Sequence, residues 1–379
     1  MKKKIFFIVN HASFFVSHRL PIAIAAKKEN YEILIIFGKP SSLKTEDESI
    51  KEILKSGINF KQLNFNNQGI FRIFDLFGLM QLIYLILKHK PYIIHSISPI
   101  ANFISSIAII FFKKTPLVIS ISGMGYLFTD NNFFKKYLSY FYLLIFKNIS
   151  KKNNLSIIVQ NNDDYNYFHN NYKLFDKIVL IKGSGIDLTL YKNVDFTLKK
   201  NYVVLPARLI KEKGIMEFIY SAVRIKKQIK NWKFIIIGQD DYKSPSLINL
   251  NILNFNQKES FEFRNYDKNL NKILIDASIV CLPSYREGMP KVLLEASAAG
   301  CAIITTNTIG CREAIINGYS GELIKVRDID SLTLMILKFI NNKKLRMKYG
   351  NNARKYAFKN YSINSVIKAH LNIYKNFYE

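Results

Sequence analysis

The chain has 379 residues, more than one hydrophobic core usually supports, and 49% of them are hydrophobic, which excludes a disordered chain. Its 55 Lys and Arg residues face 28 Asp and Glu residues, and the formal net charge of +27 attracts polyanions such as nucleic acids, anionic membranes and phosphorylated substrates. Because no RNA-recognition, helix-turn-helix or zinc-finger pattern is present, we expect no nucleic acid among the partners.

The first half of the chain alternates short apolar runs with helical patterns. Residues 5–9 follow a basic lead-in, but this apolar run is too short for a signal peptide and is interrupted by Asn10 and His11. Runs typical of buried strands lie at 5–9, 32–37, 92–95, 117–121, 156–160 and 178–181, and helical patterns at 20–28, 50–55, 73–88 and 102–112. This alternation predicts a parallel, doubly wound sheet in a domain of residues 1–185.

A second block of the same kind follows a polar stretch at 186–200, which we expect to be a linker. The block spans 201–360, with strands at 202–206, 233–238, 278–282 and 302–305 and helices at 215–229 and 270–277. The segment 361–379 holds a last helix. The predicted fold class is therefore α/β, with two doubly wound Rossmann-like domains whose ligands bind at the carboxyl ends of the strands.

Neither a transmembrane helix nor a disulfide framework is expected. The longest nearly apolar run, 100–112, is shorter than the roughly 20 residues that a membrane span needs. Cys281, Cys301 and Cys311 have neither metal-ligand spacing nor an even number, which indicates a reducing cytoplasm.

Two carboxylates border a predicted helix start in the second block. Glu287 lies in the turn after strand 278–282, and Glu295 lies eight positions on, inside the helix that Pro290 opens. The backbone N–H groups near Lys291, Val292 and Leu293 are expected to be free, so they would form an anion site at the positive end of the helix dipole. The alternative is an exposed turn acid and a solvent-facing helix acid.

Two cations follow the strand at 202–206. Arg208 lies at its end and Lys213 after a short turn, where both could face a diphosphate whose negative charge grows as it leaves. A strand followed by a lysine-rich turn is otherwise common. Gly288 would let the backbone approach a ligand closely, with loop flexibility as its alternative role.

Several motifs occur in a fixed order: Gly183-Ser-Gly-Ile-Asp187, Ala207-Arg208-Leu-Ile-Lys-Glu-Lys213-Gly214, the segment 283–300 and Gly318-Tyr-Ser-Gly-Glu-Leu-Ile324. In this order they resemble family 4 glycosyltransferases, and the resemblance covers essentially the whole chain. It implies retaining enzymes of the GT-B fold, in which two Rossmann-like domains face each other across a cleft, the first for the acceptor and the second for the nucleotide sugar.

The resemblance also implies roles for single residues. Arg208 and Lys213 would stabilise the leaving diphosphate, Glu295 would bind the ribose hydroxyls, and Glu287 would lie by the hydroxyls of the transferred sugar. The rest of the donor site would come from Gly288, Met289, Pro290, Lys291, Val292 and Leu293.

The acceptor side is less well defined by the sequence. The resemblance implies that the acceptor and the transferred sugar lie beside the loops after the first-domain strands. These loops carry His11, Ser13, His95, Ser122 and Gly123. Many relatives have Gly-Gly after the first strand and His-Gly after the fifth, whereas this chain has Ala12-Ser13 and Ser122-Gly123. His11, His18 and His95 therefore remain candidates, and each could equally be a structural histidine.

The expected reaction is transfer of an N-acetylhexosamine or hexose, with retention, from a UDP-sugar to a polyprenyl-diphosphate-linked glycan. We expect no cofactor and no metal, because Asp163-Asp164 and Asp240-Asp241 are adjacent pairs typical of caps or turns rather than an Asp-x-Asp motif. A nucleotide-sugar epimerase on the same fold and a non-enzymatic, basic membrane scaffold are the alternatives.

One segment predicts contact with a membrane. Residues 133–152, which begin with Phe133 and end with Lys152, interleave Lys with Phe, Tyr, Leu and Ile, as interfacial helices do. Lysines also follow the apolar runs 83–87 and 109–112. We therefore expect a cytoplasmic protein bound peripherally to an anionic membrane surface. The alternative is a set of core helices edged with solvated lysines.

Overall fold

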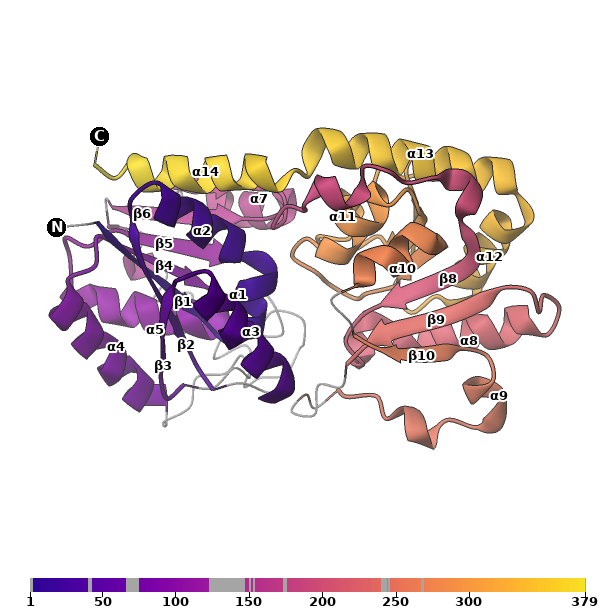
Figure 1. The fold of residues 1–379 in the computed structure, drawn as a ribbon, viewed down its shortest axis with the longest axis horizontal. Helices are drawn as coiled ribbons and strands as arrows, with labels where there is room; N and C mark the ends of the chain where they lie inside the picture. The colour runs from indigo at the N-terminus through magenta and orange to yellow at the C-terminus, as the bar shows by residue number, and fades with distance from the viewer. Residues whose placement is uncertain are drawn as a thin grey trace. The chain divides into compact units, whose positions relative to one another are not determined.

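The structure is a computed structural model that describes residues 3–39, 43–65, 75–122, 147–149, 151–152, 154–172, 176–239, 244, 246–266 and 269–378. Contacts divide the chain into two compact units, one formed by Met1–Ser184 with Asn364–Glu379 and the other by Gly185–Ile363 (Figure 1). The two units are described separately below.

The first unit is built on a seven-stranded parallel sheet with the order β3-β2-β1-β4-β5-β6-β7. The strands are β1 (Lys4–Val9), β2 (Glu32–Phe37), β3 (Asn59–Gln62), β4 (Ile93–Ile97), β5 (Leu117–Ile121), β6 (Leu155–Val159) and β7 (Ile178–Leu180). Strands β4 and β5 are buried along their whole length, as expected when helices cover both faces of a parallel sheet.

The helices of this unit are α1 (Ala12–His18), α2 (Leu20–Lys28), α3 (Leu43–Lys55), α4 (Asp75–His89), α5 (Pro99–Ala108), the 3-10 helix η1 (Ile109–Phe111), α7 (Asn162–Tyr172) and α14 (Ile363–Lys375). Helix α14 comes from the other end of the chain and lies along the first unit (Figure 1).

The second unit is built on a six-stranded parallel sheet with the order β10-β9-β8-β11-β12-β13. The strands are β8 (Lys200–Pro206), β9 (Lys233–Gly238), β10 (Glu262–Asn265), β11 (Ala277–Leu282), β12 (Ala302–Thr306) and β13 (Glu322–Ile324). The helices are η3 (Leu188–Tyr191), η4 (Phe196–Leu198), η5 (Lys211–Lys213), α8 (Ile215–Lys226), η6 (Leu250–Ile252), α9 (Phe255–Lys258), α10 (Leu270–Asp276), α11 (Lys291–Ala298), η7 (Arg312–Ala314), α12 (Ile329–Asn341) and α13 (Lys343–Asn360).

The α/β class with two parallel sheets is confirmed, and three of the elements that the sequence missed have weak local signals. Strands β3 and β10 lie at sheet edges and are largely exposed, so their sequences lack the apolar run of a buried strand. Helix α1 follows β1 after two residues and is only seven residues long, which is too short for a clear helical period.

The segment 186–200, predicted to be a linker, is packed into the second unit. The N–H of Ile186 donates to the carbonyl of Tyr361 over 2.9 Å, and Tyr191 is buried in the core of this unit. Ile186 and Tyr191 therefore attach this segment to the second unit, although most of its residues are polar.

Helix α14 is attached to the first unit through a buried polar cluster. Tyr374 Oη lies 2.7 Å from His95 Nδ1, and His95 Nε2 lies 2.8 Å from Ser120 Oγ. The guanidinium of Arg19 is buried beside the same cluster, and burial lowers its pKa to about 10. At the surface, Tyr378 stacks on Tyr92 with 3.5 Å between ring centroids.

The buried histidines predict that the protein loses stability in mild acid. Burial lowers the pKa of His370 on α14 to about 3 and holds the pKa of His95 well below its ordinary value. In the unfolded chain each histidine binds a proton near pH 6.5, so below this pH the unfolded state holds more protons than the folded state. The free energy of unfolding should fall by up to about 1.4 kcal/mol per pH unit for each histidine as the pH drops below about 6.5.

Urea unfolding at a series of pH values between about 7.5 and 4.5 measures this slope. The variant His370→Leu should flatten the slope by the contribution of one proton. A slope that is the same with and without His370 would show that this histidine titrates alike in the folded and unfolded chain.

Candidate active site

The carboxyl ends of β8 and β11 form the switch point of the second sheet. The two strands are parallel neighbours, and the chain continues from β8 to β9 on one side and from β11 to β12 on the other. Ligands of open parallel sheets bind at such a point, because the loops that follow the two strands diverge there. Residues 207–214 follow β8, and residues 283–290 follow β11.

These two loops are in direct contact. The carbonyl of Glu212 accepts the N–H of Tyr285 over 2.9 Å and the hydroxyl of Ser284 over 3.0 Å. Gly214 allows this approach, because its φ is +70° and a Cβ there would collide with the carbonyl of Pro283.

The predicted residues Lys213 and Glu287 meet at this contact. The Lys213 ammonium forms an ion pair with Glu287 Oε1, and the hydroxyl of Ser284 donates to the same oxygen over 2.7 Å. The Lys213 and Glu287 side chains are only 17% and 14% exposed, so water screens their charges incompletely. The backbone N–H of Glu287 donates to the carbonyl of Ile309 over 3.1 Å, which fixes the position of the loop.

Helix α11 starts one residue later than predicted. Pro290 lies at its N-cap, in an extended conformation, rather than at its first helical position. The expectation of three free N–H groups was wrong for Leu293, whose N–H donates to the carbonyl of Pro290 over 2.9 Å. The side chains of Met289 and Leu293 belong to the hydrophobic core, so a ligand at this helix end could meet only their backbone.

Glu295 and Lys291 form a second ion pair, with 3.6 Å between Lys291 Nζ and Glu295 Oε1. Burial raises the pKa of the Glu295 carboxyl, and the nearby Lys291 partly opposes this shift. The buried Tyr191 also has its pKa raised, by burial first and by the charge of Glu295 second. Glu295 is therefore a shielded carboxylate, and its oxygens can accept two hydrogen bonds from neighbouring hydroxyls.

Arg208 and Gly288 complete the predicted donor-side set. Arg208 lies directly beyond β8, two positions past Pro206, and its side chain is exposed. Gly288 is buried in the turn before α11, and its carbonyl packs against Gly310, where a Cβ would collide with it. Val292 is partly buried against the core.

Sequence reasoning missed several residues that support the loops. Ser284 is fully buried and joins both loops through the contacts above. The hydroxyl of Tyr285 donates to Glu217 Oε1 over 2.7 Å, and the Arg327 guanidinium lies 4.8 Å from the centre of the Tyr285 ring. Ser284 and Tyr285 stand inside the paired-carboxylate motif, but Glu212 and Glu217, to which their hydroxyls donate, are 68 or more positions away.

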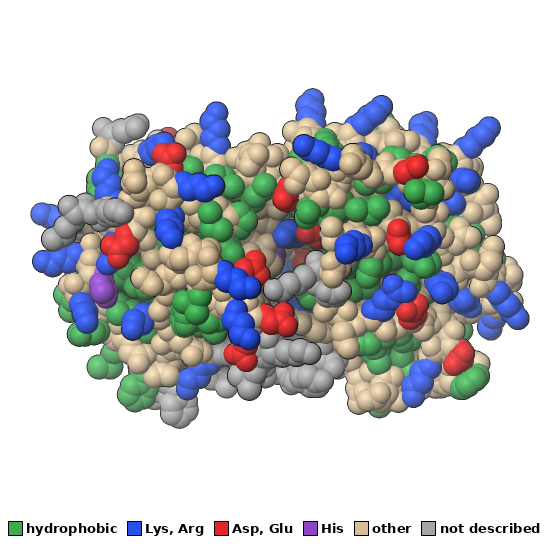
Figure 2. All heavy atoms as spheres, viewed as in Figure 1, with side chains coloured by type: hydrophobic (Ala, Val, Ile, Leu, Met, Phe, Trp, Pro, Cys, Tyr) green, Lys and Arg blue, Asp and Glu red, His purple; other side chains and the backbone are tan. Residues whose placement is uncertain are grey.

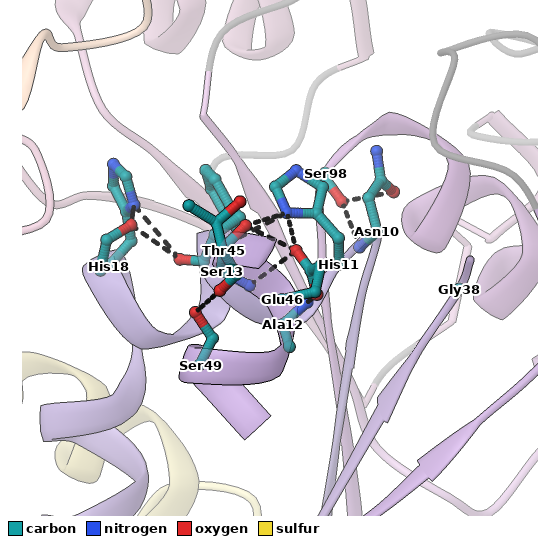
Figure 3. A network of polar contacts seen from close by, with 12 residues as sticks. Asn10, His11, Ala12, Ser13, His18, Gly38, Thr45, Glu46, Ser49 and Ser98 are labelled. Carbon is teal, nitrogen blue, oxygen red and sulfur yellow. Dashed lines mark hydrogen bonds and ion pairs between the residues drawn. The ribbon is translucent and has the colours of Figure 1, made fainter. Parts of the chain in front are cut away.

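In the first unit, the candidates His11 and Ser13 gather around Glu46 (Figure 3). The Glu46 carboxylate accepts the N–H of Ala12 over 2.8 Å, the N–H of Ser13 over 3.1 Å and the Ser13 hydroxyl over 2.6 Å. His11 Nδ1 lies 3.2 Å from the same carboxylate. Burial alone would raise the pKa of Glu46, but hydrogen bonds from His11 and Ser13 hold it below its ordinary value.

Glu46 therefore fills the anion position at the start of α1. The backbone N–H groups that could receive a phosphate there already donate to an internal carboxylate. Glu46 lies 33 positions from Ser13 in the sequence, on α3, and no local motif marks it. On the next loop, the Ser98 hydroxyl donates to Asn10 Oδ1 over 2.6 Å (Figure 3).

Of the two roles considered for His95, the structure supports that of a structural histidine. His95 is fully buried, and both of its ring nitrogens lie within hydrogen-bond distance of Tyr374 or Ser120. It is a structural histidine of the cluster under α14. His18 stacks on Phe14 with 4.4 Å between ring centroids. Ser122 follows β5 and is partly buried, whereas Gly123 lies outside the described residues.

Within the described residues, no three His, Cys, Asp or Glu side chains come close enough together to hold a metal ion. Asp164 accepts a hydrogen bond from Asn161 Nδ2 over 2.9 Å at the start of α7, whereas Asp240 and Asp241 are not described. The same part of the chain contains no helix that is both long and apolar enough to cross a bilayer.

Comparisons with known proteins identify the class of enzyme. Residues 4–161 match the family model described as Glycosyl transferase 4-like, and residues 190–356 match the model of Glycosyl transferases group 1. The fold agrees with that of a glycosyltransferase from Rickettsia africae, with a TM-score of 0.73, 19% identity and coverage of 99% of this chain and 98% of that one. The chain is therefore a glycosyltransferase of the GT-B fold, and it belongs to the enzymes that combine these two family models.

Two curated proteins show where this chain lies among such enzymes. It is 26% identical to the N,N'-diacetylbacillosaminyl-diphospho-undecaprenol alpha-1,3-N-acetylgalactosaminyltransferase of Campylobacter jejuni, over 97% of both chains. The sequence motifs named above, from Gly183 to Ile324, resemble those of this enzyme in particular, and the comparison confirms that likeness. The chain is also 25% identical to a capsular polysaccharide biosynthesis glycosyltransferase of Staphylococcus aureus, over 87% of this chain and 86% of that protein. These matches decide for glycosyl transfer over the epimerase and the scaffold.

A glycine substitution tests whether contact between the two loops positions Lys213. In Gly214→Ala the new Cβ would meet the Pro283 backbone at a φ of +70°, whereas in Gly318→Ala it would meet no atom within 4 Å at a φ of +73°. The control should lose about 1 kcal/mol of unfolding free energy from backbone strain alone. Gly214→Ala should lose at least about twice as much, and also most of its activity.

Urea unfolding and sugar-transfer rates measure these two losses. Equal stability and equal activity of the two variants would mean that the close approach at Gly214 does not position the Lys213 loop.

Proposed function

We propose that this enzyme transfers an N-acetylhexosamine or hexose, with retention and without a metal ion, from a UDP-sugar to a polyprenyl-diphosphate-linked glycan. The observation that carries the proposal is the pairing of Lys213 with Glu287 at the switch point of the second sheet, next to the start of α11. It joins a cation for a phosphate and a carboxylate for sugar hydroxyls in one shielded place.

The donor site is proposed to divide the nucleotide sugar among three groups. Glu295 accepts hydrogen bonds from the ribose hydroxyls, and partial burial of its side chain, which is 20% exposed, reduces competition from water. Arg208, Lys213 and the backbone at the start of α11 bind the diphosphate. Glu287 binds hydroxyls of the transferred sugar and holds the Lys213 ammonium in place before the donor arrives.

The chemistry proposed for this site is stabilisation of a leaving group. As the bond between the sugar and the diphosphate breaks, negative charge grows on the phosphate oxygens, and the cations of Arg208 and Lys213 stabilise it. Together they take the role that a divalent metal has in other transferases. The acceptor hydroxyl attacks the face from which the diphosphate departs and gives its proton to the departing phosphate oxygen. The configuration at the sugar carbon is therefore retained, and the enzyme's further contribution is positioning.

The proposed substrates are supported by the named relatives. One of them, as its name states, acts on an undecaprenyl-diphosphate-linked sugar, and a second Campylobacter jejuni relative and an Escherichia coli relative also carry undecaprenol diphosphate in their names. A protein of the same fold from Anabaena, with a TM-score of 0.76 and 14% identity over 98% of this chain, was crystallised with UDP. We infer that the enzyme works at the cytoplasmic face of a membrane.

Substitution of the two cations tests the donor site. Arg208→Ala and Lys213→Ala should each lower turnover by roughly 100-fold or more, the effect of losing one fixed donor to a growing anion. Glu295→Ala should mainly weaken binding of the nucleotide. Lys211→Ala is the matched control, because Lys211 is an exposed lysine of the same 3-10 helix η5.

Turnover is measured by mass spectrometry of products from a panel of nucleotide sugars and polyprenyl-diphosphate glycans, and nucleotide affinity by calorimetry with UDP. The assignment fails if Arg208→Ala and Lys213→Ala stay within about twofold of the wild-type rate.

Chelation tests the absence of a metal from the reaction. Because two cations and a helix end are proposed to neutralise the diphosphate, the transfer rate should be unchanged in excess EDTA. The measurement compares initial rates with EDTA, with magnesium and with manganese. Complete loss in EDTA that either ion restores would overturn the metal-free mechanism.

A further inference from the structure

Helix α4 exposes an apolar face that the core of the first unit does not use. One side of the helix, with Leu79, Leu82 and Ile86, packs into the core. The other side presents large hydrophobic side chains to solvent, and the nearby 3-10 helix η1 adds two more. The seven exposed residues are Leu76, Phe77, Met80, Tyr84, Leu87, Ile110 and Phe111, each between 43% and 69% exposed.

The two elements lie on one side of the sheet. Helix α4 packs against α5, and α5 continues directly into η1, so the exposed end of η1 lies on the same side of the sheet as α4. We name the seven residues the α4 face. An exposed helix ordinarily carries polar residues on its outer side, so large side chains here indicate a surface that water does not cover during function.

Lysines lie at one end of the α4 face, after the C-terminal ends of α4 and η1, and the acid that α4 contains, Asp75 at its first position, is buried. Lys88, Lys90, Lys113 and Lys114 are exposed, and Lys88 Nζ lies 5.8 Å from the centre of the Tyr84 ring. Neither residues 76–90 nor residues 99–116 contain an Asp or Glu. In Figure 2, hydrophobic side chains lie among Lys and Arg side chains over the part of the unit where Figure 1 has α4.

The field at the end of α4 is positive. Burial lowers the pKa of His89, the last residue of the helix, and the cations of Lys4 and Lys88 lower it further. Glu32, which pairs with Lys4 over 2.9 Å, opposes this effect but does not reverse it. An anionic surface would therefore be attracted to this end of the helix.

We propose that the α4 face docks on an anionic phospholipid bilayer, with its apolar side chains among the acyl chains and its lysines at the headgroups. This inference rests on the proposed function, since a polyprenyl-linked acceptor is met at a bilayer. Charge selects the occupant: a second copy of the chain would bring the same lysines into contact, whereas anionic headgroups complement them.

The segment 133–152, predicted to contact a membrane, mostly lies outside the described residues. Of its lysines, Lys152 donates to the carbonyls of Phe112 and Lys113, at the end of η1. Burial lowers the pKa of Lys152 to about 8. This ammonium supports the backbone beside the α4 face rather than reaching a headgroup.

Co-sedimentation of the full chain with vesicles tests the proposal, using phosphatidylcholine alone or mixed with phosphatidylglycerol. The apolar variant carries Phe77→Gln, Met80→Gln and Leu87→Gln, which keep good helix formers at exposed positions. The basic variant carries Lys88→Gln, Lys90→Gln, Lys113→Gln and Lys114→Gln. The matched control carries Leu198→Gln, Phe255→Gln and Leu334→Gln, three exposed hydrophobic residues of the second unit.

Wild type and control should bind the mixed vesicles equally, and each test variant should bind them at least tenfold more weakly. Added salt should weaken wild-type binding more than that of the basic variant. Binding by the apolar variant within twofold of wild type would overturn the proposal. A second result would also overturn it: the wild type binds no vesicles and is a dimer by light scattering, whereas the apolar variant is a monomer.

Transfer to a water-soluble acceptor with a short prenyl chain separates this proposal from the function on which it rests. The apolar variant should transfer sugar to this acceptor at the wild-type rate while failing to bind vesicles. Vesicle binding by a wild-type protein that transfers no sugar to any acceptor would count against the proposed function and leave the α4 face in place. If the wild-type protein transfers sugar normally but does not bind anionic vesicles, only the proposal that the α4 face docks on a bilayer is contradicted.

Discussion

The contact between the loops after β8 and β11 is the constraint on which the candidate site depends. The carbonyl of Glu212 accepts two hydrogen bonds from the loop that holds Glu287, and Gly214 lets the two backbones approach. Because parallel strands end at one edge of the sheet, their loops can carry an ammonium and a carboxylate to the same place without a long connection. The Lys213–Glu287 pair follows from this geometry, and Ser284 fixes the carboxylate. A single backbone contact thus organises charges contributed from positions 74 residues apart.

Two carboxylates of the chain itself already bind groups that could otherwise bind an anion. Glu46 satisfies the start of α1, and Glu287 partners Lys213, so two potential anion sites are already occupied within the chain. They differ in access: Glu46 is 3% exposed, whereas the Lys213–Glu287 pair still reaches solvent. An incoming phosphate can join the second site at the cost of rearranging one ion pair, but the first would require removal of a buried carboxylate. Electrostatics alone therefore favours the second unit as the place for a diphosphate.

Sequence patterns predicted the fold where burial was complete and failed where contacts were distant. The runs 32–37, 117–121 and 233–238 coincide with β2, β5 and β9, because buried parallel strands require continuous apolar residues. The Arg208, Lys213, Glu287 and Glu295 positions could be predicted because strand ends and a helix start have local signals. The role of Glu46 could not, since it acts on α1 from 33 positions away. The sequence left two roles open for His95, because a histidine near a predicted strand end gives no sign of its burial.

The return of the chain to its starting unit has a consequence for synthesis. The sheet of the first unit is complete once residue 184 has been made, yet α14, which covers Arg19, His95 and Ser120, comes from the last residues of the chain. A ribosome makes chains from the N-terminus, so this polar cluster stays uncovered while the whole second unit is translated. During this time Arg19, His95 and Ser120 of the nascent first unit lack the cover of α14. The first unit can therefore complete its packing only after α14 has been made.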